Sequence, residues 1–354
     1  MDPITLSILI FILLFVLLAI GLPIGFAMAV TGFLGSAMLI DFNAAMALLG
    51  QTAFETPITY NLSIVPLFIL MGYFASNSGL SEALFSACNT WLGSRRGGLA
   101  LATIGGCGAF AAICGSSLAT AATMTQVALP EMKRFNYDDS LATGSIAAGG
   151  TIGILIPPSV ILVLYGILTE SNIGELFLAG FIPGILTVIF FMTTILIVTA
   201  IYPETGPRGA KTTFAQKMGA FKKVWSTMLL FLLVIGGIYL GIFSPEEAAG
   251  IGASGALALA LMARTMTWDI FFDCLMETVK TSAMIFTILI GAILFNNFLV
   301  LSAVPDSIGA WIGGLDMSPT AILIIILLIY LVLGCALDSL AMILLTIPRS
   351  EEHT

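Results

Sequence analysis

The sequence predicts an all-α polytopic membrane protein, and its composition and the distribution of its apolar residues support that fold class. Of 354 residues, 59% are hydrophobic and only 9% are charged, and the mean hydropathy is +1.10. A soluble domain with so few charges could not cover its surface, whereas a chain solvated by lipid needs little polar surface. The apolar residues also form long runs separated by short polar pieces. We therefore expect a multi-pass protein in contact with the lipid bilayer.

The same composition argues against several functional classes. The only histidine, His353, lies at the end of the chain, which leaves almost no room for histidine-dependent catalysis or His-ligated metals. Five cysteines form no CxxC pair and no metal-like cluster, so reduced, buried thiols are expected. No Walker loop and no GxSxG is present, and the glycine-rich runs are typical of membrane packing. We expect no resident cofactor, no nucleic-acid partner and no enzyme.

The first apolar run is too long for one membrane helix. Residues 4–40 would extend roughly 55 Å as a helix, at about 1.5 Å per residue. The stretch GLPIG at 21–25 is the natural break, which predicts two helices. The N-terminus has no basic region, so it indicates a first membrane helix and not a cleaved signal peptide.

The remaining apolar segments follow at intervals along the chain. They lie at about 62–80, 98–130, 140–168, 175–201, 224–243, 245–263, 280–301 and 320–348. Between the segments at 245–263 and 280–301, WDIFFDCLMETVK at 268–280 alternates acidic and apolar residues at helical spacing. This pattern suits a helix that lies in the membrane interface.

Basic residues predict the orientation of these segments. The 202–223 linker contains five basic residues, so we place it in the cytoplasm. If 98–130 enters and leaves by one face as a re-entrant hairpin, and the N-terminus is periplasmic, every basic residue except Arg349 faces the cytoplasm. A pair of spanning helices at 98–130 would also return the chain to that face. Glycines and serines crowded in the middle of the segment favour the hairpin.

A weak internal repeat divides the chain. CGSSLATAATMTQVALP at 114–130 is similar to CALDSLAMILLTIP at 335–348: each has a Cys, a polar cluster ending in Ser-Leu-Ala, an apolar arm and a final Pro. The expected topology inverts the second copy, as in transporters that hold ligands between two halves. Chance similarity between small-residue membrane helices is the alternative. We assign 1–201 to a first repeat and 224–348 to an incomplete second one. The first repeat comprises two scaffold helices, an interfacial arm, a helix, the hairpin, a broken helix at about 140–168 and a final helix.

Two polar interruptions lie deep in the apolar sequence. In TIGILIPPSV at 151–160, Pro157 and Pro158 remove two amide donors and free carbonyls upstream, close to Gly153. Free carbonyls near hydroxyls make a hard oxygen cage suited to sodium, while helix N-termini attract a carboxylate. The hydroxyls of this candidate ion and anion site are those of Ser116, Ser117 and Thr120. The alternative is that the small residues serve helix packing and the prolines only kink the helix.

Asp338 is the one acidic residue well inside a predicted membrane segment. A charge at bilayer depth costs roughly 2.5–3.5 kcal/mol, so it should face a polar cavity or a partner. The alternative is an interfacial residue near the mouth of the second hairpin. Asp338 is therefore a candidate binding residue.

The sequence resembles the large membrane subunit of tripartite ATP-independent periplasmic (TRAP) transporters, the DctM type. The resemblance covers nearly the whole chain, and its specific block runs from 97 to 186. This block contains GGLALATIGGCGAFAAICGSSLATAATM and LPEMKRFNYDDSLATGSIAAGGTIGILIPPSVILVLYGILTE. Further matching stretches are PLFILMGYFASNSGL at 66–80 and GIYLGIFSPEEAAGIGA at 237–253.

The resemblance implies sodium-driven uptake of small organic acids, such as C4-dicarboxylates, across the bacterial inner membrane. It implies two protein partners, a periplasmic solute-binding protein and a small four-helix membrane subunit, and an elevator-type motion of the hairpin-bearing domain. A family sodium site corresponds here to Cys114, Gly115, Ser116, Gly153, Ile156 and Pro158. Cys114 replaces a serine, which weakens a side-chain ligand but leaves its carbonyl available. A second family site begins at Asp338 and Ser339.

Three further expectations concern the end of the chain and the function class. The polar string RSEEHT at 349–354 does not match the membrane pattern, so we expect a non-native tail and a C-terminally truncated second repeat. A stand-alone ion-coupled anion permease is the nearest alternative function. An intramembrane lipid-linked transferase is a more distant one, because it would need convergent acidic groups.

Overall fold

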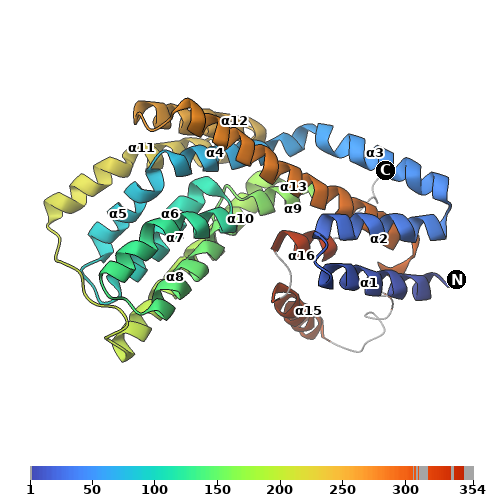
Figure 1. Ribbon diagram of the computed structural model, residues 1–354, viewed down its shortest axis with the longest axis horizontal. Coiled ribbons are helices and arrows are strands. Elements are labelled where there is room, and N and C mark those ends of the chain that lie inside the picture. Colours follow the sequence, from blue (N-terminus) through green and yellow to red (C-terminus); the bar gives the residue numbers. More distant parts are fainter. Residues whose placement is uncertain (1, 306, 308–309, 311–317, 336–338, 347–354) are drawn as a thin grey trace. The chain divides into compact units, whose positions relative to one another are not determined.

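The computed structural model confirms the all-α fold class. It describes residues 2–305, 307, 310, 318–335 and 339–346, and the regular structure within those residues is helical throughout. Figure 1 shows the helices with their labels. By length and composition, three of them could cross a bilayer in the part of the chain that the structure describes: α10 (Ile173–Ile201), α11 (Phe214–Tyr239) and α13 (Trp268–Leu301). The pair Phe42–Ile58 and Tyr60–Asn77 would add a fourth if it formed one bent span.

The chain divides into two compact units, each built from separate stretches of sequence. One unit comprises 1–62 and 281–354, and the other comprises 63–280. Each unit therefore draws on both of the repeats that the sequence predicts. Compact units and sequence repeats need not coincide, so the repeat stays a prediction.

The first unit contains the N-terminal helices and the end of the chain. Its elements are α1 (Pro3–Ala19), α2 (Ile24–Leu39), α3 (Phe42–Ile58), the second half of α13, α15 (Pro319–Gly334) and α16 (Ser339–Thr346). The break between α1 and α2 lies within GLPIG, where Gly21 has a φ of +91°. The two helices predicted from this break are thus separate.

Close backbone contact holds α2 against α13 in this unit. A Cβ built on Gly32 would lie 2.5 Å from the Phe295 amide nitrogen, and one built on Gly25 would lie 2.8 Å from the Ile288 nitrogen. Small residues allow the two helices to approach closely, and close approach increases the number of dispersion contacts between them. These contacts matter because association of helices within lipid is not driven by the hydrophobic effect. The Phe11 and Phe295 rings add an edge-to-face contact at 5.3 Å.

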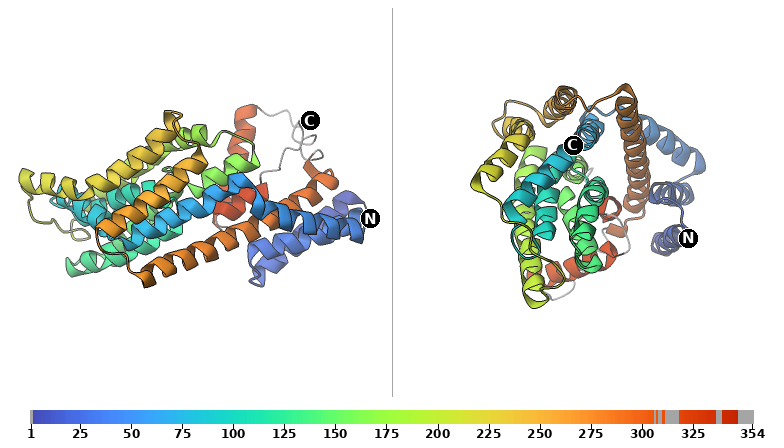
Figure 2. Two further views of the ribbon diagram at one scale, coloured as in Figure 1. Left: turned by 90° about the horizontal axis from the view of Figure 1, so that it is seen from above. Right: turned by 60° about the vertical axis from the view of Figure 1, so that its left-hand side comes forward.

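The second unit is a helical bundle built around one buried helix. Its elements are α4 (Ile64–Asn77), α5 (Leu80–Leu92), α6 (Gly98–Cys114), α7 (Ser117–Arg134), α8 (Asp139–Thr151), η2 (Ile152–Ile154), α9 (Val160–Leu168), α10, α11, α12 (Pro245–Met262) and the start of α13. Two further views show α6 to α12 packed together (Figure 2). Nearly every residue of α6 is buried, and α4, α5, α7, α8 and α10 surround it.

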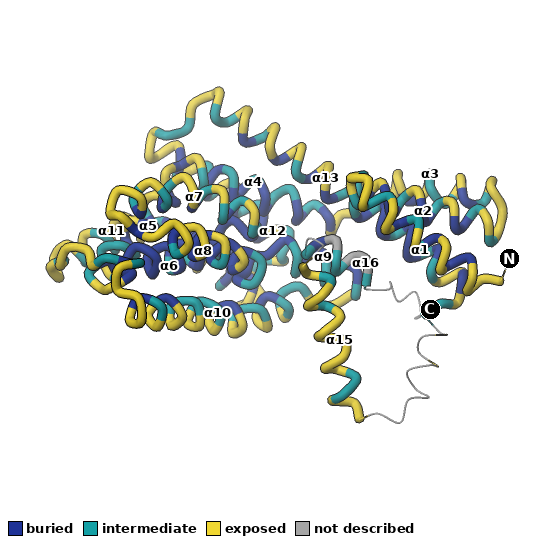
Figure 3. The backbone as a smooth tube through the Cα atoms, turned by 60° about the horizontal axis from the view of Figure 1, so that its bottom comes forward, coloured by how far each residue is buried: buried dark blue, intermediate teal, exposed yellow. Residues whose placement is uncertain are grey.

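Outer helices of the same unit expose apolar side chains. Along α10, Ile182 is 66% exposed and Phe190 63% exposed, so most of this helix is drawn as exposed in Figure 3. Its sequence is apolar throughout, with a mid-helix free of charge. Lipid is the solvent that such a surface requires.

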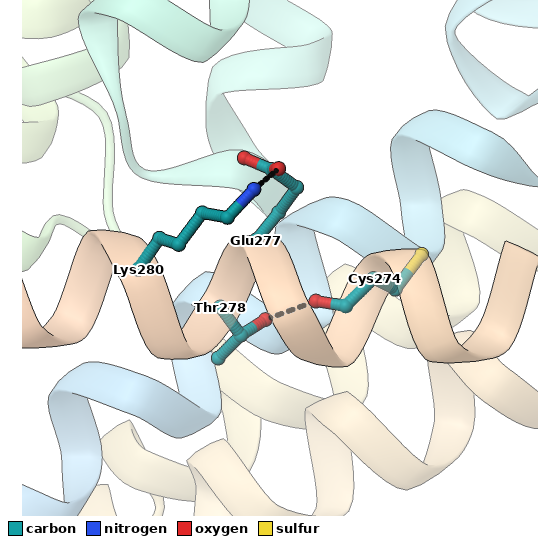
Figure 4. A network of polar contacts seen from close by, with 4 residues as sticks. All are labelled: Cys274, Glu277, Thr278 and Lys280. Carbon is teal, nitrogen blue, oxygen red and sulfur yellow. Dashed lines mark hydrogen bonds and ion pairs between the residues drawn. The ribbon is translucent and has the colours of Figure 1, made fainter.

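The stretch 268–280 differs from its prediction as a separate interfacial helix. It forms the first half of α13, which continues without a break to Leu301. Its buried side packs on α4, where Phe271 stacks on Phe74 at 5.8 Å and Asn77 donates to the Cys274 sulfur at 3.5 Å. An adjacent, exposed part of the same helix carries the Lys280–Glu277 ion pair at 2.8 Å (Figure 4). The alternation therefore indicates correctly a helix with a buried and an exposed side, but no glycine or proline near residue 280 ends that helix.

Candidate functional site

The first polar interruption, at residues 114–120, contains the turn that joins α6 to α7. Helix α6 ends at Cys114, Gly115 has a φ of +63°, and Ser116 caps α7 by accepting a hydrogen bond from the Ala119 amide at 3.4 Å. A left-handed residue at this point favours glycine. The Thr120 hydroxyl donates to the Ser116 carbonyl at 2.7 Å. The polar residues of 114–120 thus serve the turn and the start of α7.

The second interruption separates α8 from α9. After α8 comes the short helix η2, and then a cis peptide bond joins Pro157 to Pro158. Ser159 caps α9 by accepting from the Leu162 amide at 3.4 Å, and its buried hydroxyl donates to the Ile154 carbonyl at 2.7 Å. Because residue 157 is a proline, the Gly153 carbonyl receives no hydrogen bond from the amide four residues later.

The two interruptions are in direct contact. The Val160 amide donates to the Gly115 carbonyl at 3.4 Å. A Cβ built on Gly153 would lie 2.6 Å from the Ser116 carbonyl oxygen, and one built on Gly115 would collide with the Pro158 carbonyl oxygen. Glycine is therefore required at both positions by the close approach of another backbone segment.

The structure places the predicted site residues of 114–120 and 153–158 in two sets. Gly115, Ser116, Thr120, Gly153 and Pro158 lie at the contact between the hairpin tip and the helix break. The others pack around it. Cys114 backs onto Gly72 of α4, the Ser117 carbonyl lies against Gly150 of α8, and Ile156 packs on Gly184 of α10. Pro157 is buried beside them.

The second predicted site is described only in part. Asp338 lies outside the described residues, and Ser339 begins α16 in the first unit. The role of Asp338 and Ser339 in a second binding site therefore stays a prediction.

Hydrogen bonding distinguishes the oxygens that are free to bind a cation. The Ser116 carbonyl accepts from both the amide of Thr120, at 3.1 Å, and its hydroxyl, so both lone pairs are used. The Ile152 carbonyl accepts from Leu155 and Ile156. The Gly153 carbonyl and the hydroxyls of Ser116 and Thr120 keep lone pairs available. These oxygens are hard ligands, as sodium prefers, and the stretches 114–120 and 153–160 contain no charged side chain.

Helix ends supply the electrostatics of this contact. The C-terminus of α6 and the end of η2 direct carbonyls toward it, whereas the N-termini of α7 and α9 direct amides toward it. Carbonyl ends favour a cation and amide ends favour an anion, each by about 0.3–1 kcal/mol when exposed and more when partly buried. Among the described residues, no three His, Cys, Asp or Glu side chains converge as a metal site would require. The arrangement suits a neutral oxygen site, not a transition-metal centre.

Sequence reasoning missed Ser159 and Gly72. Ser159 follows two prolines and precedes an apolar run, which is the pattern of a helix N-cap. Gly72 supports the tip from α4, where a Cβ would lie 3.1 Å from the Cys114 Cα. No local pattern identifies Gly72, because its partner is more than 40 positions away in the sequence.

A match along nearly the whole chain determines its family. A family model described as "Tripartite ATP-independent periplasmic transporter, DctM component" matches residues 11–349. The chain belongs to the DctM family of TRAP transporters. It is thus a component of a membrane transporter and not an enzyme, and the all-α multi-pass architecture agrees with that membership.

Curated relatives of similar identity carry names with different substrates. The chain is 34% identical to the C4-dicarboxylate TRAP transporter large permease protein DctM of Pseudomonas aeruginosa, over 90% of this chain and 74% of that protein. It is also 34% identical to the isethionate TRAP transporter permease protein DctMQ of Oleidesulfovibrio alaskensis, over 89% of this chain and 50% of that one. The sialic acid TRAP transporter large permease protein SiaM of Vibrio cholerae is 32% identical, over 82% and 67% respectively.

Proposed function

We propose that this protein is the transport subunit of a TRAP carrier for sodium-coupled uptake of a small organic acid, of the C4-dicarboxylate type. Membership of the family supports a secondary transporter that depends on a periplasmic binding protein. The named relatives all carry organic acids, so an acidic solute is the class they share. Their identities differ by little, and a C4-dicarboxylate is proposed because the first of them is named for that solute.

The observation that carries the proposal is the contact between the hairpin tip and the helix break. It brings the backbone of Gly153 against the Ser116 carbonyl and the Thr120 hydroxyl, in the same turn as the Ser116 side chain. Oxygen ligands without a carboxylate suit a monovalent cation that must bind and leave in each cycle. Sodium is the proposed ion, held by Ser116, Gly153 and Thr120, with the backbone of Cys114, Ile156 and Pro158 around it.

The acid is proposed to bind beside the sodium ion. The N-termini of α7 and α9 begin at this contact and present to it the positive ends of two helix dipoles. A carboxylate there would neutralise the bound cation. We propose further that a small four-helix membrane subunit braces the protein, that the N-terminus is periplasmic in the inner membrane, and that the hairpin-bearing unit moves as an elevator.

Reconstituted transport tests this function. Proteoliposomes would contain this protein with its small membrane subunit, and the cognate binding protein would be added outside. We expect accumulation of labelled C4-dicarboxylate only with an inward sodium gradient and only with the binding protein present. Uptake without the binding protein would support the stand-alone permease instead, and uptake driven by protons alone would refute sodium coupling.

A further inference from the structure

The segment between α10 and α11 is tied to the bundle by hydrogen bonds from several neighbouring elements. We call residues 203–213 the strap. The Gly97 amide donates to the Gly206 carbonyl at 2.9 Å, and the Gly209 amide donates to the Gly93 carbonyl at 3.0 Å. The Thr212 hydroxyl donates to the Thr90 carbonyl at 2.7 Å. The strap therefore crosses the end of α5 and the start of α6.

Tyr137 closes the end of α7 with its backbone. Asn136 has a φ of +54°, its amide donates to the Lys133 carbonyl at 3.1 Å, and the Tyr137 amide donates to the Met132 carbonyl at 3.0 Å. These two bonds are the Schellman pattern that satisfies the last carbonyls of a helix. The position of Tyr137 is thus fixed by the second arm of the hairpin.

The side chain of Tyr137 connects this arm to the first arm and to the strap. Its hydroxyl accepts from the Leu99 amide, in the first turn of α6, at 3.0 Å and donates to the Pro207 carbonyl at 2.9 Å. The residue is only 6% exposed, and burial raises the pKa of its hydroxyl above the ordinary value, so it remains a donor. One hydroxyl thereby joins three chain segments.

The next residue ties the broken helix to the same point. Asp138 caps α8, with its side chain accepting from the Ser140 amide at 2.9 Å, and its own amide donates to the Thr205 carbonyl at 3.0 Å. Helices α6, α7 and α8 are therefore fixed to each other at the end opposite the site. Their far ends carry Cys114, Ser117 and Thr151, which flank the hairpin tip and the helix break.

Both hydrogen bonds and close backbone contacts hold the strap. A pocket of about 240 Å³ lies beside part of it, lined by residues that include Asn89, Tyr137, Pro207 and Thr212. Next to this pocket the strap makes fewer dispersion contacts than a packed core would, so the loss of a hydrogen bond there should loosen it.

We propose that Tyr137 and the strap form a clasp that fixes the open end of the α6–α7 hairpin to α8, and that Tyr137 thereby acts as a positioning residue for the ion site. The role of Tyr137 in positioning the ion site rests on the proposed function, whereas the existence of the clasp does not. The clasp makes the hairpin and the broken helix one body. Because α6 extends about 23 Å from Leu99 to its end at Cys114, at about 1.5 Å per residue, a small rotation at the clasp displaces the tip.

Amide hydrogen exchange on the intact transporter complex tests the clasp directly. Tyr137→Phe removes the hydroxyl and keeps the ring, and Tyr202→Phe, at an exposed position beside the strap, is the matched control. We expect exchange of residues 97–101 and 203–213 to be at least tenfold faster in Tyr137→Phe and unchanged in Tyr202→Phe. Equal exchange in Tyr137→Phe and the unaltered protein would overturn the clasp.

A second pair of variants covers the case in which Tyr137→Phe fails to fold. Thr212→Val removes the bond to Thr90, while Thr205→Val removes a hydroxyl that bonds only to Tyr202 in the same stretch. We expect faster amide hydrogen exchange of the strap in Thr212→Val and unchanged exchange in Thr205→Val. For positioning, half-saturation by sodium should rise three- to tenfold in Tyr137→Phe, with the Km for the loaded binding protein unchanged. Faster exchange with unaltered sodium dependence would overturn the positional role, and the absence of any sodium dependence in the unaltered complex would refute the proposed function and leave the clasp standing.

Discussion

Replacing Gly153 by alanine tests whether the contact between the two helix breaks forms the ion site. The added Cβ would lie 2.6 Å from the Ser116 carbonyl oxygen, 2.8 Å from its carbon and 2.9 Å from the Thr120 hydroxyl oxygen. An ordinary contact begins near 3.4 Å, so the tip and the break must separate by about 0.8 Å. Two of these atoms belong to the backbone, which means that no side-chain rotation relieves the overlap.

The magnitude follows from the cost of overpacking. Forcing one extra methyl group into a packed site costs about 1–3 kcal/mol. If that cost falls on the sodium-bound arrangement, the apparent sodium affinity decreases by roughly 5- to 150-fold, at about 1.4 kcal/mol per factor of ten. Gly144→Ala is the matched control, because Gly144 is exposed on α8 and a Cβ added there would meet nothing within 4 Å. It should raise stability slightly, by about 0.5–1 kcal/mol, because alanine favours a helix.

The assay is a sodium titration of solute uptake in proteoliposomes that contain the complete complex. Gly153→Ala should shift the half-saturating sodium concentration upward by at least fivefold, and Gly144→Ala should leave it unchanged. A shift of less than twofold in Gly153→Ala, with the protein folded, would refute the argument that this contact shapes the ion site.

Three further predictions concern stability. Ser159→Ala removes a buried hydroxyl that bonds the Ile154 carbonyl at 2.7 Å, so it should cost about 1–3 kcal/mol and lower the thermal unfolding temperature, whereas the exposed Ser171→Ala should not. Gly32→Ala would place a Cβ 2.5 Å from the Phe295 amide nitrogen, so it should destabilise the protein without altering the half-saturating sodium concentration. The control is Gly50→Ala, because a Cβ added at Gly50 meets nothing within 4 Å. Equal unfolding temperatures of the two variants would contradict the packing argument. Hydrogen bonds from Ser140 lower the pKa of Asp138 from its ordinary 3.8, so this carboxylate stabilises the fold at neutral pH, and the benefit is lost as pH falls below 3.8 and through the lowered value. The unfolding temperature of Asp138→Asn should therefore lie below that of the unaltered protein at pH 7 and approach it at pH 3, and a constant difference would show that the charge is irrelevant.

Glycine and proline made the breaks predictable from sequence. GLPIG separates α1 from α2, the glycine-rich middle of 98–130 contains the turn at Gly115, and the proline pair ends the α8 segment. At these points the missing Cβ or missing amide acts on its immediate neighbours. A local chemical cause leaves a local sequence signal.

Helix limits in the polar segments were less predictable. Helix α11 begins at Phe214, ten residues before the apolar run, because Thr213 and Gln216 form a capping box. The lysines that marked this stretch as a linker are compatible with a helix, since their long side chains lose little freedom there. Charge indicates which compartment a segment faces, but it does not decide whether the segment is helical.

Contacts between distant segments left no signal in a single sequence. Gly153 and Ser116 are 37 positions apart, and the strap contacts residues more than 100 positions earlier. Nothing in the composition of 203–213 distinguishes a strap from a free loop. Candidate site residues could be proposed from their chemistry, whereas the reason for glycine at position 153 became visible only with its structural partner, Ser116.

The absence of charged side chains at this contact gives a physical reason for coupling in the proposed function. A fixed carboxylate would neutralise sodium in the absence of solute, and the ion could then cross alone. Here, the stretches 114–120 and 153–160 offer only dipoles and neutral oxygens. A cation bound alone would leave a net charge in a medium where charges are costly, and so would an acid bound alone. Binding the cation beside one carboxylate group of the acid reduces that cost for both. Under the proposed function, a neutral site would therefore favour joint occupancy and make the energy of the sodium gradient available to the solute.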